Sequence, residues 1–147
     1  MQQSIALIGL CLVLSAPAQL ASSDTSAREQ AVRTFFRLRE QMLGERGSPA
    51  DVDALLALFA PGASYEHPAA GVRMTLDEAR RGMLAHLGEG REVQLIIVRV
   101  LRGNTFVAVE TTLAYNVQRD GKEQHINRSG IALFEFQGAR ISRVAEY

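Results

Sequence analysis

From Arg91 to the C-terminus, the apolar residues change from helical spacing to the alternation typical of β-strands. Three turn signals divide this half of the chain: Arg102-Gly103-Asn104, Arg119-Asp120-Gly121 and Gln137-Gly138-Ala139. Tight turns join strands that run antiparallel to each other. The sequence therefore predicts a four-strand antiparallel meander, with strands at Val93–Leu101, Thr105–Val117, His125–Phe136 and Arg140–Tyr147.

The residues before this meander show helical spacing. Two capping boxes, Ser26–Glu29 and Thr75–Glu78, mark where helices begin. Pro49 marks a further start, because proline is favoured in the first turn of a helix. The sequence predicts three helices: from Ala27 to Leu43, from Pro49 to the pair Pro61-Gly62, and from Leu76 to the stop at Gly88.

The stretch Leu55–Pro68 links the second helix to a short strand that ends at His67-Pro68. Tyr65 and His67 are two residues apart on this strand, so their side chains share a face. An imidazole beside a phenol makes this strand the best candidate for a chemical site. The small residues that follow, Ala69–Arg73, predict a loop.

Three helices cannot cover both faces of such a sheet. We therefore predict an α+β fold in which a cone-shaped, curved antiparallel sheet, the four-strand meander plus a short strand, wraps around three N-terminal helices and encloses an apolar pocket. The outer face of the sheet is partly apolar, at positions such as Ala108, Ile131 and Leu133. This pattern predicts a homodimer through that face.

The N-terminus has the pattern of a secretory signal peptide. Ile5–Leu14 is an apolar run too short to span a bilayer, and Ala16-Pro17-Ala18 fits a cleavage site. Met1–Ser4 lacks Lys and Arg, so an uncleaved anchor is the alternative. After cleavage we expect no stable membrane insertion and a periplasmic or secreted protein. The expected division is a signal peptide at residues 1–18, a disordered lead-in at 19–25, and one domain at 26–147.

Composition argues against several partners and cofactors. The chain has 16 basic and 16 acidic residues and a formal net charge of zero, whereas nucleic-acid-binding proteins carry a basic surface. His67, His86 and His125 have no metal-ligand spacing. The sequence contains neither a Gly-rich phosphate loop nor a Gly-x-Ser-x-Gly motif. We expect no nucleic-acid partner, no metal and no cofactor.

The order of helices and strands resembles the nuclear transport factor 2-like superfamily, in particular its SnoaL-like and ketosteroid-isomerase-like branch. The resemblance covers Ala27–Tyr147 and is carried chiefly by Ala57–Pro68 and by the ending Gly138–Tyr147. It implies the cone-shaped fold, and it places His67 where the isomerases have a catalytic aspartate. Members of the superfamily include cyclases, dehydratases, epoxide hydrolases and non-enzymatic binding or dimerisation modules, so the fold alone does not choose an activity.

The same resemblance argues against ketosteroid isomerisation. The phenol donor of the isomerases would fall near Phe36 and their protonated acid near Ala132, and neither side chain can donate a hydrogen bond. A dienolate formed here would lack the charge stabilisation that is often the largest catalytic term.

His67 is the candidate catalytic residue, because an imidazole exchanges protons near neutral pH. The alternative is a histidine that caps the strand end or faces solvent. Tyr65 would donate a hydrogen bond to a ligand carbonyl, or only pack with its hydroxyl satisfied. Arg128 shares the predicted cavity face and sits at the cavity mouth, pairs with a carboxylate, or binds an acidic ligand, because a buried unpaired guanidinium is costly. Further candidate ligand contacts are Phe36, Tyr115 and Tyr147.

The sequence thus supports two functions. One is acid/base action on a small hydrophobic molecule that carries a carbonyl or hydroxyl group, of the isomerase, cyclase, dehydratase or hydrolase type. The other is a non-catalytic module for ligand binding or dimerisation. A structural partnership with another exported protein, through the outer sheet face, is a third alternative.

Overall fold

The computed structural model describes residues 17–147. The apolar run Ile5–Leu14 lies outside the described residues, so the signal peptide stays a prediction. Within residues 17–147, no helix is long and apolar enough to cross a membrane.

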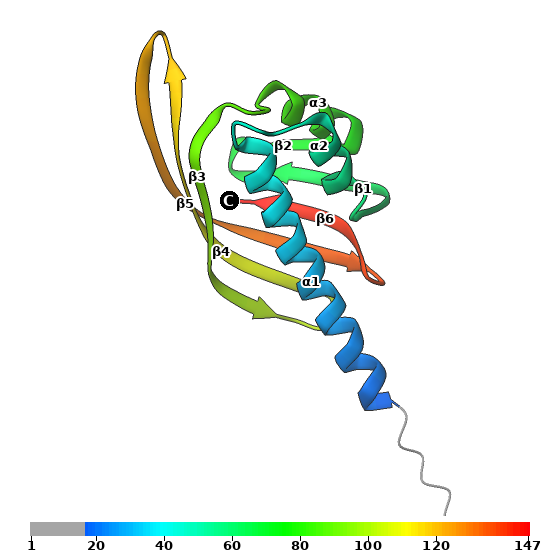
Figure 1. Cartoon of the computed structure of the whole chain (residues 1–147). Coiled ribbons are helices and arrows are strands. Elements are labelled where there is room, and N and C mark those ends of the chain that lie inside the picture. The colour runs from blue at the N-terminus through cyan, green and yellow to red at the C-terminus, as the bar shows by residue number, and fades with distance from the viewer. Residues whose placement is uncertain (1–16) are drawn as a thin grey trace, which may run out of the picture.

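Three helices lie against the concave face of a curved six-stranded sheet (Figure 1). The sheet order is β2-β1-β6-β5-β4-β3, which confirms the predicted α+β fold and its antiparallel meander. The helices are α1 (Pro17–Leu43), α2 (Pro49–Leu56), the short 3-10 helix η1 (Pro68–Ala70) and α3 (Leu76–Ala85). The strands are β1 (Phe59–His67), β2 (Val72–Thr75), β3 (Gly90–Arg102), β4 (Phe106–Arg119), β5 (Lys122–Gln137) and β6 (Arg140–Glu146).

The first helix begins earlier than the sequence predicts. α1 already includes Pro17, the first described residue, so residues 19–25, predicted as a disordered lead-in, belong to the helix. Neither Gly nor Pro interrupts the chain from Ala18 to Leu43, so no residue in this range ends the helix. Ser26, the predicted cap, consequently lies inside α1 and does not start it.

The corner after α2 contains more strand than the sequence predicts. α2 ends at Leu56, and β1 has already begun at Phe59, which pairs with Ile141 of β6. Pro61-Gly62 therefore does not end a helix. The pair lies within β1, at the point where the register against β6 shifts, and Gly62 adopts a positive φ of 75° there.

The loop predicted at Ala69–Arg73 instead contains η1 and the start of β2. Gly71 adopts φ 65°, and this left-handed turn brings β2 back antiparallel to β1, with Val72 opposite His67. β1 itself runs parallel to β6. The sheet is therefore mixed and has six strands, rather than the antiparallel five predicted.

Aromatic side chains fill the space between α1 and the sheet. The Phe35 ring lies 5.1 Å from that of Phe134 on β5 and 6.1 Å from that of Phe59 on β1, measured between ring centroids. Burial of one such side chain contributes about 1.5–3 kcal/mol. Phe36 packs on Phe134 as well and also lines the cavity described below. The core therefore closes one end of that cavity.

Candidate functional site

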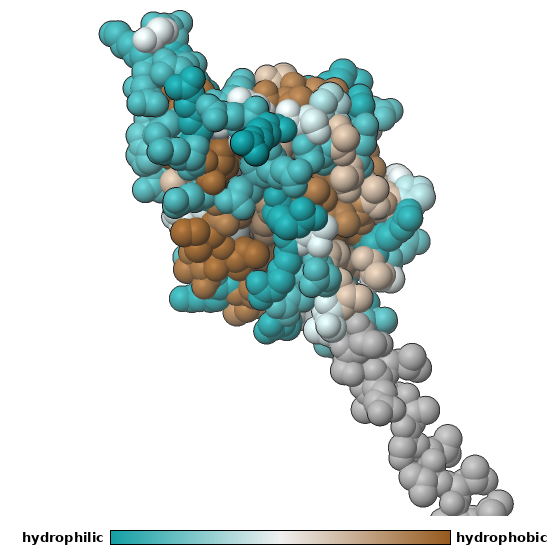
Figure 2. Space-filling model, in the orientation of Figure 1, coloured by the Kyte–Doolittle hydropathy of each residue, from teal (hydrophilic) through white to brown (hydrophobic). Residues whose placement is uncertain are grey.

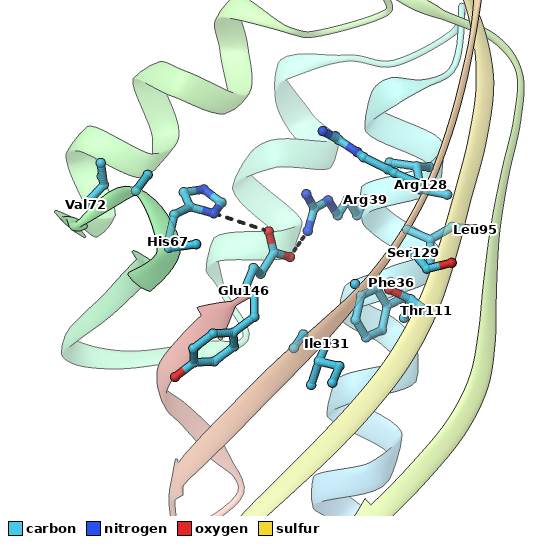
Figure 3. Close-up of a pocket in the computed structure, with 16 residues that line it drawn as sticks. Phe36, Arg39, His67, Val72, Leu95, Thr111, Arg128, Ser129, Ile131 and Glu146 are labelled. Carbon is cyan, nitrogen blue, oxygen red and sulfur yellow. Dashed lines mark hydrogen bonds and ion pairs between the residues drawn. The ribbon is translucent and has the colours of Figure 1, made fainter.

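A cavity of about 470 Å³ lies between α1, η1 and the sheet (Figure 3). This is the size of a small-molecule site. Four side chains that carry charge or titrate near neutral pH line it, Arg39, His67, Arg128 and Glu146. Much of the rest of the wall is apolar, contributed by Phe36, Val72, Leu95, Leu113, Ile131 and Ala132 among others.

Arg39 holds the polar part of the site together. Its Nη1 donates to the hydroxyl of Tyr65 at 3.1 Å and also to Glu146 Oε1. The other carboxylate oxygen of Glu146 lies 3.9 Å from His67 Nδ1, within ion-pair range and beyond a hydrogen bond. The three helices and strands that meet here, α1, β1 and β6, thus bring Arg39, His67 and Glu146 to one point (Figure 3).

The surroundings of His67 favour its neutral form. Burial lowers the pKa of His67, and the positive charges of Arg39 and Arg128 lower it further. Burial also raises the pKa of the Tyr65 phenol, against the opposing effect of the same two arginines. At neutral pH the site therefore holds a neutral imidazole that can accept a proton and a phenol that keeps its own.

A second cavity, of about 360 Å³, lies on the other side of His67 and is lined by Met42, Tyr65, Met74, Met83 and Tyr115 among others. Arg39, His67, Val72 and Arg128 line both cavities, so they form the boundary between the two. The two cavities thus share His67, and we refer to them together as the recess.

The sequence matches the SnoaL-like domain over residues 32–144, well over half of the chain. The chain belongs to this family. A search of curated protein sequences found no match.

Solved structures support the same fold. The SnoaL-like chain matches a protein with a ketosteroid isomerase-like fold from Catenulispora acidiphila, solved with trimethylamine, at 18% identity and a TM-score of 0.64, over 80% of this chain and 84% of that one. It matches an LEH-like epoxide hydrolase from M. tuberculosis at 18% identity and a TM-score of 0.65, over 84% and 83%. It matches the epoxide hydrolase/cyclase-like enzyme SalBIII at 18% identity and a TM-score of 0.68, over 84% and 92%. At these identities the likeness shows the fold.

The predicted site residues of the SnoaL-like domain divide between the two cavities. His67 and Arg128 line both, Phe36 and Tyr147 line the first, and Tyr65 and Tyr115 line the second. Phe36 and Ala132, where the isomerases have their oxyanion donors, both line the first cavity and carry no donor there.

The other histidines lie apart from His67. His86 Nδ1 is 3.1 Å from Glu89 Oε2, and His125 Nδ1 is 2.8 Å from the Asn116 side-chain oxygen. Within the part of the chain that the structure describes, no group of three or more His, Cys, Asp or Glu side chains could hold a metal ion.

Arg39 and Glu146 are the two site residues that sequence reasoning missed. Arg39 occupies a place on the apolar stripe of α1, three residues after Phe36 and three before Met42. Glu146 has the same strand parity as the fully buried Val144. A charged residue at a core-facing position indicates a possible site. Here the two such residues, Arg39 and Glu146, form an ion pair with each other.

Proposed function

We propose that this SnoaL-like domain binds a small hydrophobic molecule that carries a carbonyl or hydroxyl group and moves a proton on it, as an isomerase, cyclase, dehydratase or hydrolase does. The observation that carries the proposal is the neutral imidazole of His67, which faces the Arg39–Glu146 pair in a largely apolar cavity. A base, a fixed cation and an apolar wall are the groups that proton transfer to or from an apolar ligand, or from an activated water, requires.

In this proposal His67 is the general base. Its Nδ1 faces Glu146, and a hydrogen bond between them, closed when a ligand fills the cavity, leaves the lone pair of Nε2 free to accept a proton. The positive charge of Arg39 then stabilises the oxygen on which negative charge develops. Tyr65 is a positioning residue, because its hydroxyl accepts a hydrogen bond from Arg39.

Two features favour the other function, a non-catalytic binding module. The His67 side chain is 42% exposed, and its distance of 3.9 Å from Glu146 is too long for a hydrogen bond. In such a module the same residues would only line the pocket. For either function we propose export, because Ile5–Leu14 and Ala16-Pro17-Ala18 have the pattern of a cleavable signal.

An NMR titration of the three histidines tests the proposal, with His67→Gln used to assign the His67 resonance and 2-acetylnaphthalene as an apolar ketone probe. We expect His67 to titrate below the ordinary histidine pKa and its resonance to move when the ketone is added. On any substrate that is turned over, the rate falls as the pH drops through the pKa of His67, because the protonated ring cannot accept a proton, and His67→Gln loses about 100-fold or more.

The contrary result is as clear. If His67 titrates like an exposed imidazole and its resonance ignores the ketone, it is not a general base in a ligand site. The binding-module function then replaces the catalytic one.

A further inference from the structure

We propose that the recess selects ligands that carry a carboxylate, and that Arg128 is the group that binds it. The inference rests on the proposed function, since it concerns the same site, and it names the ligand class: an apolar acid whose carboxylate lies on Arg128 and whose reacting part lies beside His67.

Arg128 stands in a row of apolar residues on the concave face of the sheet. Its partner on β4 is Leu113, and the partner of Leu113 on β3 is Leu95. Both leucines line the first cavity together with Arg128. Arg128 is exposed, so its guanidinium remains open to water and to a ligand, and a carboxylate bound there would form a charge-assisted pair with it.

The described residues supply no such partner. Within residues 17–147, the Arg128 side chain makes no hydrogen bond and no ion pair. The side-chain carboxylates that line the two cavities are engaged elsewhere, Glu146 with Arg39 and Glu89 with His86. The main-chain oxygen of Tyr147, which also lines the first cavity, accepts a hydrogen bond from the Ile131 amide. Arg128 therefore differs from Arg39, which already forms an ion pair with Glu146.

The wall between Arg128 and Glu146 leaves room for a ligand. Gly130 and Ala132 follow Arg128 at alternate positions of β5, and Ala132 is the partner of Glu146 on β6. Both residues line the first cavity, and neither has a side chain larger than a methyl group. The main-chain oxygen of Tyr147 lies 2.9 Å from where a Cβ on Gly130 would be, so the open space is beside Ala132 and Arg128. In Figure 3 the guanidinium groups of Arg128 and Arg39 point from opposite elements into the space that His67 faces. A ligand can thus lie along β5 from Arg128 to His67.

The chemistry of the site favours a carboxylate over other anions. The planar guanidinium matches the two oxygens of a carboxylate with two parallel hydrogen bonds. A phosphate ester would bring a second negative charge into a recess that already contains Glu146. The leucine row and Phe36 suit a hydrocarbon or aromatic body rather than a second polar group.

A matched pair of probes tests this inference: 2-naphthylacetate and its neutral amide, 2-naphthylacetamide, measured by calorimetry and by NMR at low ionic strength. We expect the wild-type protein to bind the acid about tenfold or more tightly than the amide. Arg128→Gln abolishes this preference and leaves the affinity for the amide unchanged, and Arg128→Lys retains part of it. The matched control is Arg140→Gln, an exposed arginine at the opposite end of β6 from Glu146, which keeps the full preference.

Three results would overturn the inference: equal affinities of the wild-type protein for acid and amide, no binding of the acid at millimolar concentration, or an acid preference that survives Arg128→Gln. The measurement needs no turnover, so it is separate from the proposed function. If the wild-type protein binds acid and amide equally well while the His67 resonance still moves on addition of the ketone, the carboxylate preference is refuted and the proposed function is not.

Discussion

Arg39 is bonded at once to Tyr65 and Glu146, and its charge helps to keep His67 neutral. Arg39→Met removes that charge and frees Glu146 to face the imidazole. Both changes favour the protonated ring, so the pKa of His67 rises. The free energy of unfolding falls by about 2 kcal/mol, because a half-buried carboxylate loses its partner.

The matched control is Arg37→Met, on the exposed side of the same helix, which leaves the pKa of His67 unchanged. An NMR titration of His67 in the three proteins, with a urea unfolding curve for each, measures both effects. If His67 titrated identically in wild type and Arg39→Met, the charge of Arg39 would not act on the site.

At this scale the sequence predicts what strand parity alone determines. Tyr65 and His67 share the concave face because they are two residues apart on one strand, and Arg128 faces the cavity for the same reason. The contact between Arg39 and Glu146 spans most of the chain. Only the packing of α1 against β6 creates it, and no local spacing reports that packing.

Among the helices and strands, two capping boxes of the same kind have different outcomes. The Thr75 hydroxyl accepts a hydrogen bond from the Glu78 amide, and the Glu78 carboxylate accepts one from the Thr75 amide, so this box starts α3. Ser26 lies inside α1. We expect Thr75→Ala to lower the free energy of unfolding by about 1 kcal/mol. Ser26→Ala changes it by less than about 0.5 kcal/mol, since the residue is exposed and alanine suits a helix interior.

Urea unfolding of both variants with an unchanged slope measures the difference. If both variants lost the same free energy of unfolding, Ser26 would also cap a helix. α1 would then begin near Ala27, as predicted from the sequence, and would not include Pro17.

The strands missed by sequence reasoning share one physical cause. β2 is four residues long and lies at the edge of the sheet, where among the described strands it pairs with β1 alone. The chain reaches that pairing only through the turn at Gly71. The parallel pairing of β1 with β6 joins the two ends of the domain. The meander, by contrast, is visible in the sequence because each of its turns lies between the strands that it joins.

For the molecule as a whole, the order of helices and strands was sufficient to predict the fold, because three helices fit only the concave side of a curved sheet. The opposite face is left uncovered. Ile96, Val98 and Leu101 of β3 are each more than half exposed, as is Ile131 of β5, which also lines the first cavity. Figure 2 shows apolar residues gathered on the side of the molecule along which β3 and β4 run in Figure 1. Soluble monomers rarely expose such a patch without a partner.

We therefore propose a homodimer through this outer face, and Ile96→Glu tests it. Ile96 is 56% exposed, and its partner on β4 is Thr112, so the change adds a charge to the patch without disturbing the core. We expect sedimentation velocity to show a dimer for the wild type at micromolar concentration and a monomer for Ile96→Glu, because burial of an unpaired carboxylate at an apolar interface is costly.

The control is Ala54→Glu, at an exposed position of α2, which stays dimeric. If the wild type is a monomer, or if Ile96→Glu still dimerises, the outer face of the sheet is not the dimer interface. Ligand binding by a monomeric Ile96→Glu variant then shows whether the recess works without its partner, as expected from a cavity lined by one chain.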